Sequence, residues 1–148
     1  RGGAEADALD GGEGNDRLEG GLGADTYLFG RGDGQDTLVD TDATAGVQDA
    51  LHFGFDISAE QIWLRQLGNN LEISLIGTTD KITVSNWYLG ADRYVEVLQL
   101  ADGRQLLDSQ VQNLVQAMAS FSPPAAGQTT LPTNYADSLT PVIAANWQ

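Results

Sequence analysis

Large apolar residues recur at a fixed interval at the start of the chain. Leu9, Leu18 and Tyr27 stand nine residues apart, and Leu38 continues the series after a two-residue insertion. A glycine-rich stretch precedes each of them. About six residues suffice for a tight turn and about three for a short strand, so this spacing predicts short strands joined by turns. We expect the four apolar side chains to point inward and to stack on one another.

Beyond residue 50 the pattern changes to that of longer strands. Leu71, Ile73 and Leu75 alternate with polar residues, which predicts a strand with one buried face. Other β-rich stretches lie at residues 51–53, 62–64 and 95–100, and tight turns lie at residues 68–70 and 101–103. We therefore expect a set of strands that closes the end of the stack.

A helical period occurs near the end of this segment. Its apolar residues fall at helical spacing: Val111, Leu114, Val115 and Met118. They predict one short amphipathic helix over residues 108–119, which we expect to cap the last strands. Residues 120–138 have the composition of a flexible linker. The chain then ends in an apolar tail that is either disordered or recognised by a partner.

The composition narrows the chemistry. The chain has 148 residues, with 21 Asp and Glu against 7 Lys and Arg and a formal charge of −14. This balance argues against nucleic acid or an anionic membrane surface as a partner, because phosphate-binding surfaces are basic. The absence of Cys excludes a disulfide scaffold and a thiol nucleophile, and a single His, His52, excludes a His-cluster metal site. Since no G-x-S-x-G motif occurs either, we expect no enzyme activity.

The sequence also lacks targeting signals that can be read directly. It has neither an apolar run long enough to span a membrane nor an N-terminal signal peptide. It starts at Arg1, inside the repeated pattern, so we expect it to be a segment of a longer protein. Upstream repeats or an effector domain of that parent would precede Arg1.

The acidic residues are concentrated among the glycines. Residues 1–50 hold 12 of the 21 acidic residues. The segments that begin at Gly2, Gly11 and Gly20 follow the pattern G-G-x-G-x-D-x-U-x, where U is a large apolar residue, and a partial copy begins at Gly32. This tandem repeat is typical of the parallel β-roll that binds calcium.

The Asp at position six of each copy is a candidate ligand. Calcium takes about 6–8 oxygen ligands, and the backbone carbonyls of one turn with one Asp supply about half of them. The other half must come from the turn stacked against it, which in a two-sheet roll lies two repeats further on. We therefore expect two pairs of aspartates: Asp7 with Asp25, and Asp16 with Asp36.

Three further acids stand outside this regular series. Asp49 either completes a site with Asp25 or is a surface acid. Asp80 is followed by Lys81 and is expected at the surface. Glu5 occupies a position where the repeat has Gly, so it distorts the first turn, adds a ligand or lies unpaired at the edge.

A resemblance to a known family rests on three features: the repeats, residues 70–80 and the sequence Asn86-Trp87-Tyr88. Together they resemble the RTX family of type I secreted bacterial proteins, with the haemolysin-type calcium-binding-related module after the repeats. The resemblance implies that several calcium ions are bound. The ligand positions that it implies are Asp7, Asp16, Asp25 and Asp36 with neighbouring backbone carbonyls. Together with Asp49 and Glu5, the candidate ligand positions are Asp7, Asp16, Asp25, Asp36, Asp49, Gly3, Glu5, Gly12, Glu13, Gly14, Gly21, Leu22, Gly23, Gly32, Asp33 and Gly34. The end of the chain resembles the secretion end of the RTX adenylate cyclase toxins, a branch of this family. The implied secretion-signal residues are Leu139, Val142, Ile143 and Trp147.

We therefore expect an all-β fold in three parts. Residues 1–50 would form a calcium-bound parallel β-roll. Residues 51–120 would form a β-rich cap with one short C-terminal α-helix, and residues 121–148 a flexible linker with the secretion signal.

The resemblance implies a non-catalytic module that calcium folds. Bacterial cytosol holds little free calcium, so the chain would pass the type I secretion machinery unfolded and fold outside the cell as a secreted protein. The alternative is an adhesin or glycan-binding module that calcium rigidifies. Exposed aromatic side chains near Trp63 or Trp87 would favour that alternative, although aromatic residues in such strands pack in the core more often than they form a ligand platform.

Overall fold

The strands of the repeat segment follow the nine-residue spacing. The computed structural model describes residues 5–39, 49–54, 57–85, 87–89, 95, 97–121, 127–128 and 130–148. The first strands are β1 (Ala8–Asp10), β2 (Arg17–Glu19), β3 (Thr26–Phe29) and β4 (Gln35–Val39). The apolar residues predicted to stack are all buried: Leu9, Leu18, Tyr27 and Leu38. The nine-residue pattern therefore predicted both the strands and their buried positions.

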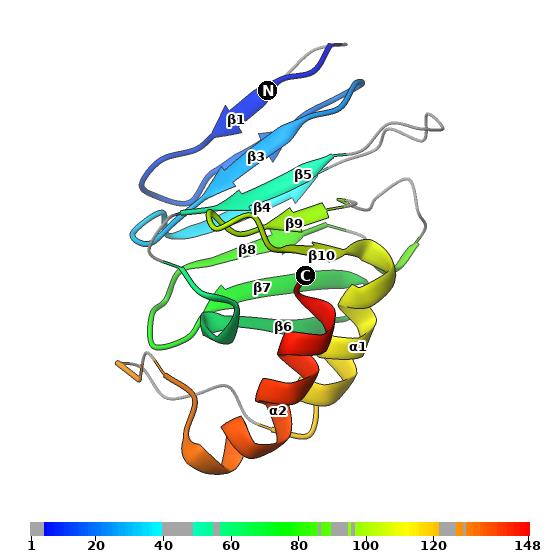
Figure 1. Cartoon of the computed structure of the whole chain (residues 1–148). Helices are drawn as coiled ribbons and strands as arrows, with labels where there is room; N and C mark the ends of the chain where they lie inside the picture. The colour runs from blue at the N-terminus through cyan, green and yellow to red at the C-terminus, as the bar shows by residue number, and fades with distance from the viewer. Residues whose placement is uncertain are drawn as a thin grey trace.

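Successive strands alternate between two sheets. β1 pairs in parallel with β3, and β3 with β5 (Ala50–Phe53), while β2 pairs in parallel with β4. Among the described residues, the sheet orders are β1-β3-β5-β9-β10 and β2-β4-β8-β7-β6. Figure 1 shows the strands layered one above another, with β1 at the N-terminal edge. Because paired strands come from alternate repeats, the turns that precede them also lie against each other in pairs.

The later strands close both sheets. They are β6 (Ile62–Leu67), β7 (Asn70–Leu75), β8 (Lys81–Val84), β9 (Val97–Gln99) and β10 (Gln105–Leu107), with short 3₁₀ turns η1 (Ala59–Gln61) and η2 (Trp87–Leu89). β8 and β9 extend the parallel pairing, whereas β6, β7 and β10 add antiparallel strands. Both sheets are therefore mixed, and the fold is β-rich.

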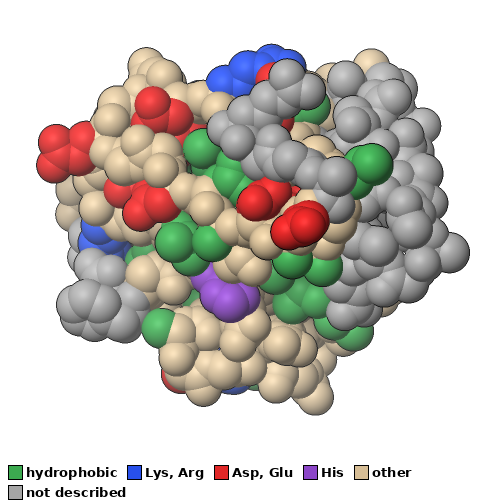
Figure 2. Space-filling model, turned by 90° about the horizontal axis from the view of Figure 1, so that it is seen from above, with side chains coloured by type: hydrophobic (Ala, Val, Ile, Leu, Met, Phe, Trp, Pro, Cys, Tyr) green, Lys and Arg blue, Asp and Glu red, His purple; other side chains and the backbone are tan. Residues whose placement is uncertain are grey.

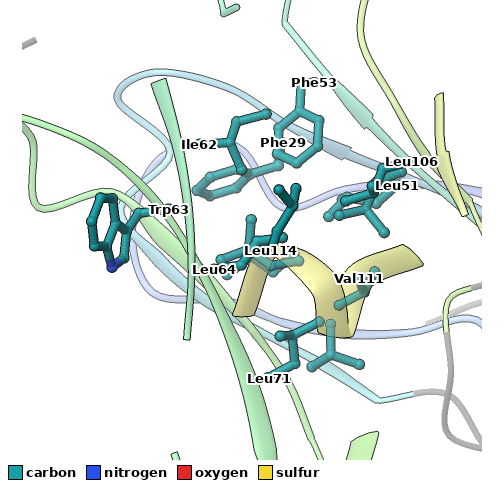
Figure 3. Packing of buried hydrophobic residues seen from close by; sticks show 14 of the residues in the cluster. Phe29, Leu51, Phe53, Ile62, Trp63, Leu64, Leu71, Leu106, Val111 and Leu114 are labelled. Atoms are coloured by element: carbon teal, nitrogen blue, oxygen red, sulfur yellow. The ribbon is translucent and has the colours of Figure 1, made fainter. Parts of the chain in front are cut away.

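The inner faces of the two sheets meet in an apolar core. Figure 3 shows Phe29 and Phe53 beside Ile62, with Leu114 of the first helix close to Leu64. Trp63 and Trp87, which were predicted to pack in the core or at a sheet edge, have only 2% and 3% of their surface exposed. Neither offers an aromatic platform at the surface.

The first helix, α1 (Asp108–Met118), agrees with the prediction. It buries the four apolar residues that fall at helical spacing: Val111, Leu114, Val115 and Met118. The helix lies against β6, and the N–H of Leu64 in that strand points at the Met118 sulfur, 3.3 Å away. α1 therefore covers the end of the core, as expected for a cap.

The C-terminal tail differs from the prediction. A second helix, α2 (Thr133–Asn146), packs against α1 (Figure 1). The expectation of one short helix and a flexible tail is therefore wrong. The physical reason is that the apolar residues of the tail repeat at helical spacing and cover the core, with Leu139, Ile143 and Trp147 buried. In the part of the chain that the structure describes, no helix is long and apolar enough to cross a membrane.

Candidate calcium site

The turns that precede the strands stack so closely that two glycines have no room for a side chain. Gly34 has a φ of +84°, and a Cβ added there would lie 2.5 Å from the carbonyl oxygen of Gly14. Gly23 has a φ of +96°, and its added Cβ would lie 2.6 Å from the carbonyl carbon of Glu5. Only glycine meets both conditions without strain. The stacking therefore brings the backbone carbonyls of one turn against the next turn.

The position-six aspartates link the stacked turns through one oxygen each. The Asp7 N–H donates to Asp25 Oδ1 at 3.0 Å, and the Asp16 N–H donates to Asp36 Oδ1 at 2.9 Å. The structure thus brings together both pairs expected from the repeat. The Asp25 N–H donates in turn to Asp49 Oδ1 at 2.7 Å. Asp49 is buried, so the alternative in which it is a surface acid is wrong.

The second carboxylate oxygen of two aspartates lies buried. Oδ2 of Asp16 and Oδ2 of Asp36 have no hydrogen-bond partner among the described residues. Only 2% of Asp36 is exposed, and this burial raises the pKa of its carboxyl above the usual value, with the charges of Asp16 and Asp33 adding to the effect. A buried ionised oxygen without a donor is costly, and a bound cation would remove that cost.

The backbone would have to supply much of a cation's coordination shell. In the described ranges, no three His, Cys, Asp or Glu side chains form a group that could hold a metal ion on their own. The aspartates instead follow one another at one per turn. Calcium accepts backbone carbonyls as readily as carboxylates, whereas zinc prefers nitrogen and sulfur ligands. The donors that the turns offer are therefore suited to calcium.

Asp80 has a structural role that the sequence reading missed. It was expected at the surface, but only 9% of it is exposed. Its Oδ2 accepts the Gly32 N–H at 2.9 Å, and its Oδ1 accepts the Gly34 N–H at 3.0 Å. The Lys81 N–H donates to the Gly34 carbonyl at 2.9 Å, which sets β8 beside β4. Both Asp80 oxygens have backbone donors, so this carboxylate closes the turn that precedes β8. It differs in this from Asp36, whose Oδ2 has no donor among the described residues.

Asn15 is a second residue that was missed. Its Oδ1 accepts the Gln35 N–H at 3.0 Å, so a side chain from position five also bridges stacked turns. Asn15 occupies this position in one copy only, where the others have Ala or Gln. A repeat consensus therefore gave no signal for it.

The remaining predicted positions are placed unevenly. Gly3 lies outside the described residues. The side chains of Glu5, Glu13 and Leu22 are exposed, so of these residues the backbone carbonyls are the candidate ligands. The glycines of the turns have positive φ: Gly12, Gly14, Gly21, Gly23, Gly32 and Gly34. Asp33 Oδ2 accepts the Gly30 N–H at 2.9 Å and so closes its own turn. Figure 2, which looks onto the N-terminal edge, shows carboxylates at several places on that face.

Acidification is expected to weaken calcium binding. In the metal-free fold the pKa of Asp36 lies above the ordinary value of 3.8, so folding takes up a proton. Folding of the metal-free chain should therefore become less unfavourable as the pH falls through the raised pKa towards 3.8, with no further gain from this group below it. Calcium competes with that proton, so its dissociation constant should rise over the same window. Titration calorimetry at about pH 7 and about pH 4 measures the change.

The control for this prediction is Asp36→Asn. It removes the titrating group, so its calcium affinity should depend less on pH than that of the unaltered chain. An affinity that is the same at both pH values in the unaltered chain would contradict the prediction.

Comparisons with known proteins agree with this geometry. Residues 1–38 match the family model described as RTX calcium-binding nonapeptide repeat (4 copies), and residues 70–110 match the haemolysin-type calcium binding protein related domain. A stretch of 94 residues is 37% identical to the iron-regulated protein FrpA of Neisseria meningitidis serogroup C. The match covers 62% of this chain but only 8% of FrpA. The family models thus confirm the resemblance of residues 1–38 to the RTX calcium-binding repeats and of residues 70–110 to the haemolysin-type calcium binding protein related domain.

Proposed function

We propose that this chain is a non-catalytic calcium-binding module whose repeats fold into a parallel β-roll when several calcium ions bind between the stacked turns. The observation that carries the proposal is the pair of buried Oδ2 atoms of Asp16 and Asp36, which lack donors among the described residues. One column of sites would lie between the turns of these two residues. The other would lie between the turns of Asp7, Asp25 and Asp49, which the carboxylates of Asp25 and Asp49 link in the same way.

The energetics favour folding that depends on calcium. Without metal, buried carboxylates repel one another, and glycine-rich turns lose much conformational entropy on ordering. A ligand that binds only the folded state, present at 100 times its dissociation constant, adds about 2.7 kcal/mol for each independent site. Several such sites would offset an unfavourable intrinsic folding free energy, so binding and folding would be one event.

We further propose that the chain is part of a secreted bacterial protein and that its tail is a type I secretion signal. Support comes from the repeats and from the resemblance of the tail, with Leu139, Val142, Ile143 and Trp147 as signal residues. Upstream repeats or an effector domain of the parent would carry the biological activity. The three-part division at residues 50 and 120 stays a prediction within this proposal.

The glycan-binding alternative loses the feature that would have favoured it. Trp63 and Trp87 lie in the core, and the ring of Trp63 is 6.1 Å from that of Tyr135 on α2. We therefore retain the calcium-folding module as the function that the geometry supports best.

Far-UV circular dichroism with calcium and with a chelator tests the folding proposal. The expected result is a β-rich spectrum in calcium and a largely disordered spectrum after chelation. Magnesium at the same concentration serves as the matched ion, since it demands near-octahedral geometry and loses its water reluctantly. A chelated chain that keeps its full β signal would sink the proposal.

Deletion of residues 139–148 tests the secretion proposal, with export from a Gram-negative host as the readout. Because the same residues pack in the folded core, a control must damage the fold while keeping the tail. Phe53→Ala serves this purpose, since Phe53 contacts Trp147 in the fold and lies outside the tail. Export should be lost in the deletion and kept in Phe53→Ala. Equal export of the deleted and full-length chains would refute the signal.

A further inference from the structure

The tail is buried in the folded molecule. Leu139, Ile143 and Trp147 form one apolar face of α2 and its C-terminal end, and each has only 1% to 2% of its surface exposed. Figure 1 shows α2 lying against α1 with the C-terminus close to β10. A partner that reads these side chains therefore has no access to them in the folded state.

Polar contacts hold the C-terminal end of the tail, and an aromatic contact holds the start of α2. Asn113 Nδ2 on α1 donates to Asn146 Oδ1 at 3.0 Å, and the Gln148 N–H donates to the Gln105 carbonyl at 2.9 Å. At the other end, the ring of Tyr135 lies 4.6 Å from that of Phe121. These contacts join the tail to α1 and to β10, so its docking depends on the folded cap.

One strand connects the tail to the candidate calcium turns. β5 begins at Ala50, directly after Asp49, whose carboxylate accepts the Asp25 N–H. The same strand ends at Phe53, whose ring meets that of Trp147 edge-on at 6.3 Å. The four residues of β5 therefore connect the candidate ligand Asp49, just before the strand, to Phe53 at its end, which is the aromatic partner of the tail.

The tail has little reason to stay helical when it is released. α2 is 14 residues long and carries Pro141 inside it, which removes a backbone hydrogen bond. Isolated helices of about 12–15 residues are marginal in water even in favourable sequences. Without the surface formed by Phe53 and α1, the tail would be an extended, accessible segment.

We infer that calcium controls access to the C-terminal tail: the tail is displayed in the metal-free chain and buried in the calcium-loaded fold. This inference rests on the proposed function. It assigns to the apolar tail two exclusive states, one open to the export machinery and one packed in the core. Calcium outside the cell would then remove the tail from the machinery as the chain folds, so an exported chain would not be bound again.

Thiol labelling tests this directly, because the chain contains no Cys. Ile143→Cys places a thiol on the buried face, and Ala144→Cys places one on the exposed face of the same helix. In calcium, a maleimide should label position 143 about tenfold or more slowly than position 144. After chelation, the two rates should be similar. Equal rates at both positions in calcium would overturn the inference.

A second variant tests the connection to the turns. Asp49→Asn in the Ile143→Cys background should raise the calcium concentration needed for protection, whereas Asp102→Asn, at an exposed hairpin turn, should not change it. An unchanged calcium requirement in Asp49→Asn would refute coupling through β5. In the unaltered chain, exchange of the Trp147 N–H, bonded to the Ile143 carbonyl at 2.9 Å, gives a readout that needs no substitution.

The outcomes separate this inference from the proposed function. If the dichroism spectrum does not respond to calcium, the proposed function fails. If the spectrum responds while position 143 and the Trp147 amide stay unprotected, the folding module stands and the calcium-controlled tail is wrong.

Discussion

Gly34→Ala is expected to disrupt the stack between the turns of Asp16 and Asp36. The new methyl group would meet the Gly14 carbonyl oxygen at 2.5 Å, and the backbone would have to keep a φ of +84°. Backbone strain of this kind costs about 1–3 kcal/mol. Overpacking against a backbone that cannot move away costs about 1–3 kcal/mol more. Denaturant unfolding in saturating calcium should show the summed loss, and calorimetry should show weaker calcium binding.

Gly32→Ala is the matched control for this change. Gly32 lies in the same turn with a φ of +87°, but no described atom comes within 4 Å of an added Cβ. It therefore carries the backbone strain without the clash. Equal effects of the two substitutions would show that close stacking of the turns does not matter for stability or for calcium binding.

Trp147→Ala is expected to cause a large loss of stability at the other end of the molecule. Trp147 is buried, and its ring packs edge-on against Phe53. Truncation of a buried Trp to Ala removes about 3–5 kcal/mol from the free energy of unfolding. Because calcium binds the folded state, the calcium concentration needed for folding should also rise. Unfolding in denaturant at several calcium concentrations measures both effects.

Trp147→Phe separates packing from the loss of the indole N–H. The indole nitrogen of Trp147 is buried without a hydrogen-bond partner among the described residues, so its removal should cost little. The Phe variant should therefore retain most of the stability. If Trp147→Ala left both the stability and the calcium requirement unchanged, the tail would not belong to the cooperative core.

The repeat segment could be predicted from sequence because its geometry is encoded in its period. A spacing of nine residues implies one turn and one strand, and alternation between two sheets places alternate repeats side by side. The pairs Asp7 with Asp25 and Asp16 with Asp36 follow from that placement alone. In this segment the residue pattern along the chain therefore also determines which turns lie against each other.

The misses occurred where tertiary contacts override local composition. Asp80 lies outside the regular repeat and beside a lysine, and only the pairing of β8 with β4 shows that it accepts two backbone donors. The tail follows a linker-like stretch and contains Pro141, a residue that disfavours a helix interior. Its apolar residues do fall at helical spacing, but the helix forms because this face packs against α1 and Phe53, and the sequence does not reveal that partner surface.

Hydrogen exchange at the stacked turns tests most directly whether calcium holds them together. The Asp16 N–H is bonded to Asp36 Oδ1 at 2.9 Å, and the Thr37 N–H to the Asp16 carbonyl at 2.8 Å. In calcium, both amides should be protected from exchange. After chelation, or with magnesium in place of calcium, they should exchange at rates close to those of an unfolded chain. Protection that is the same with and without calcium would contradict the account.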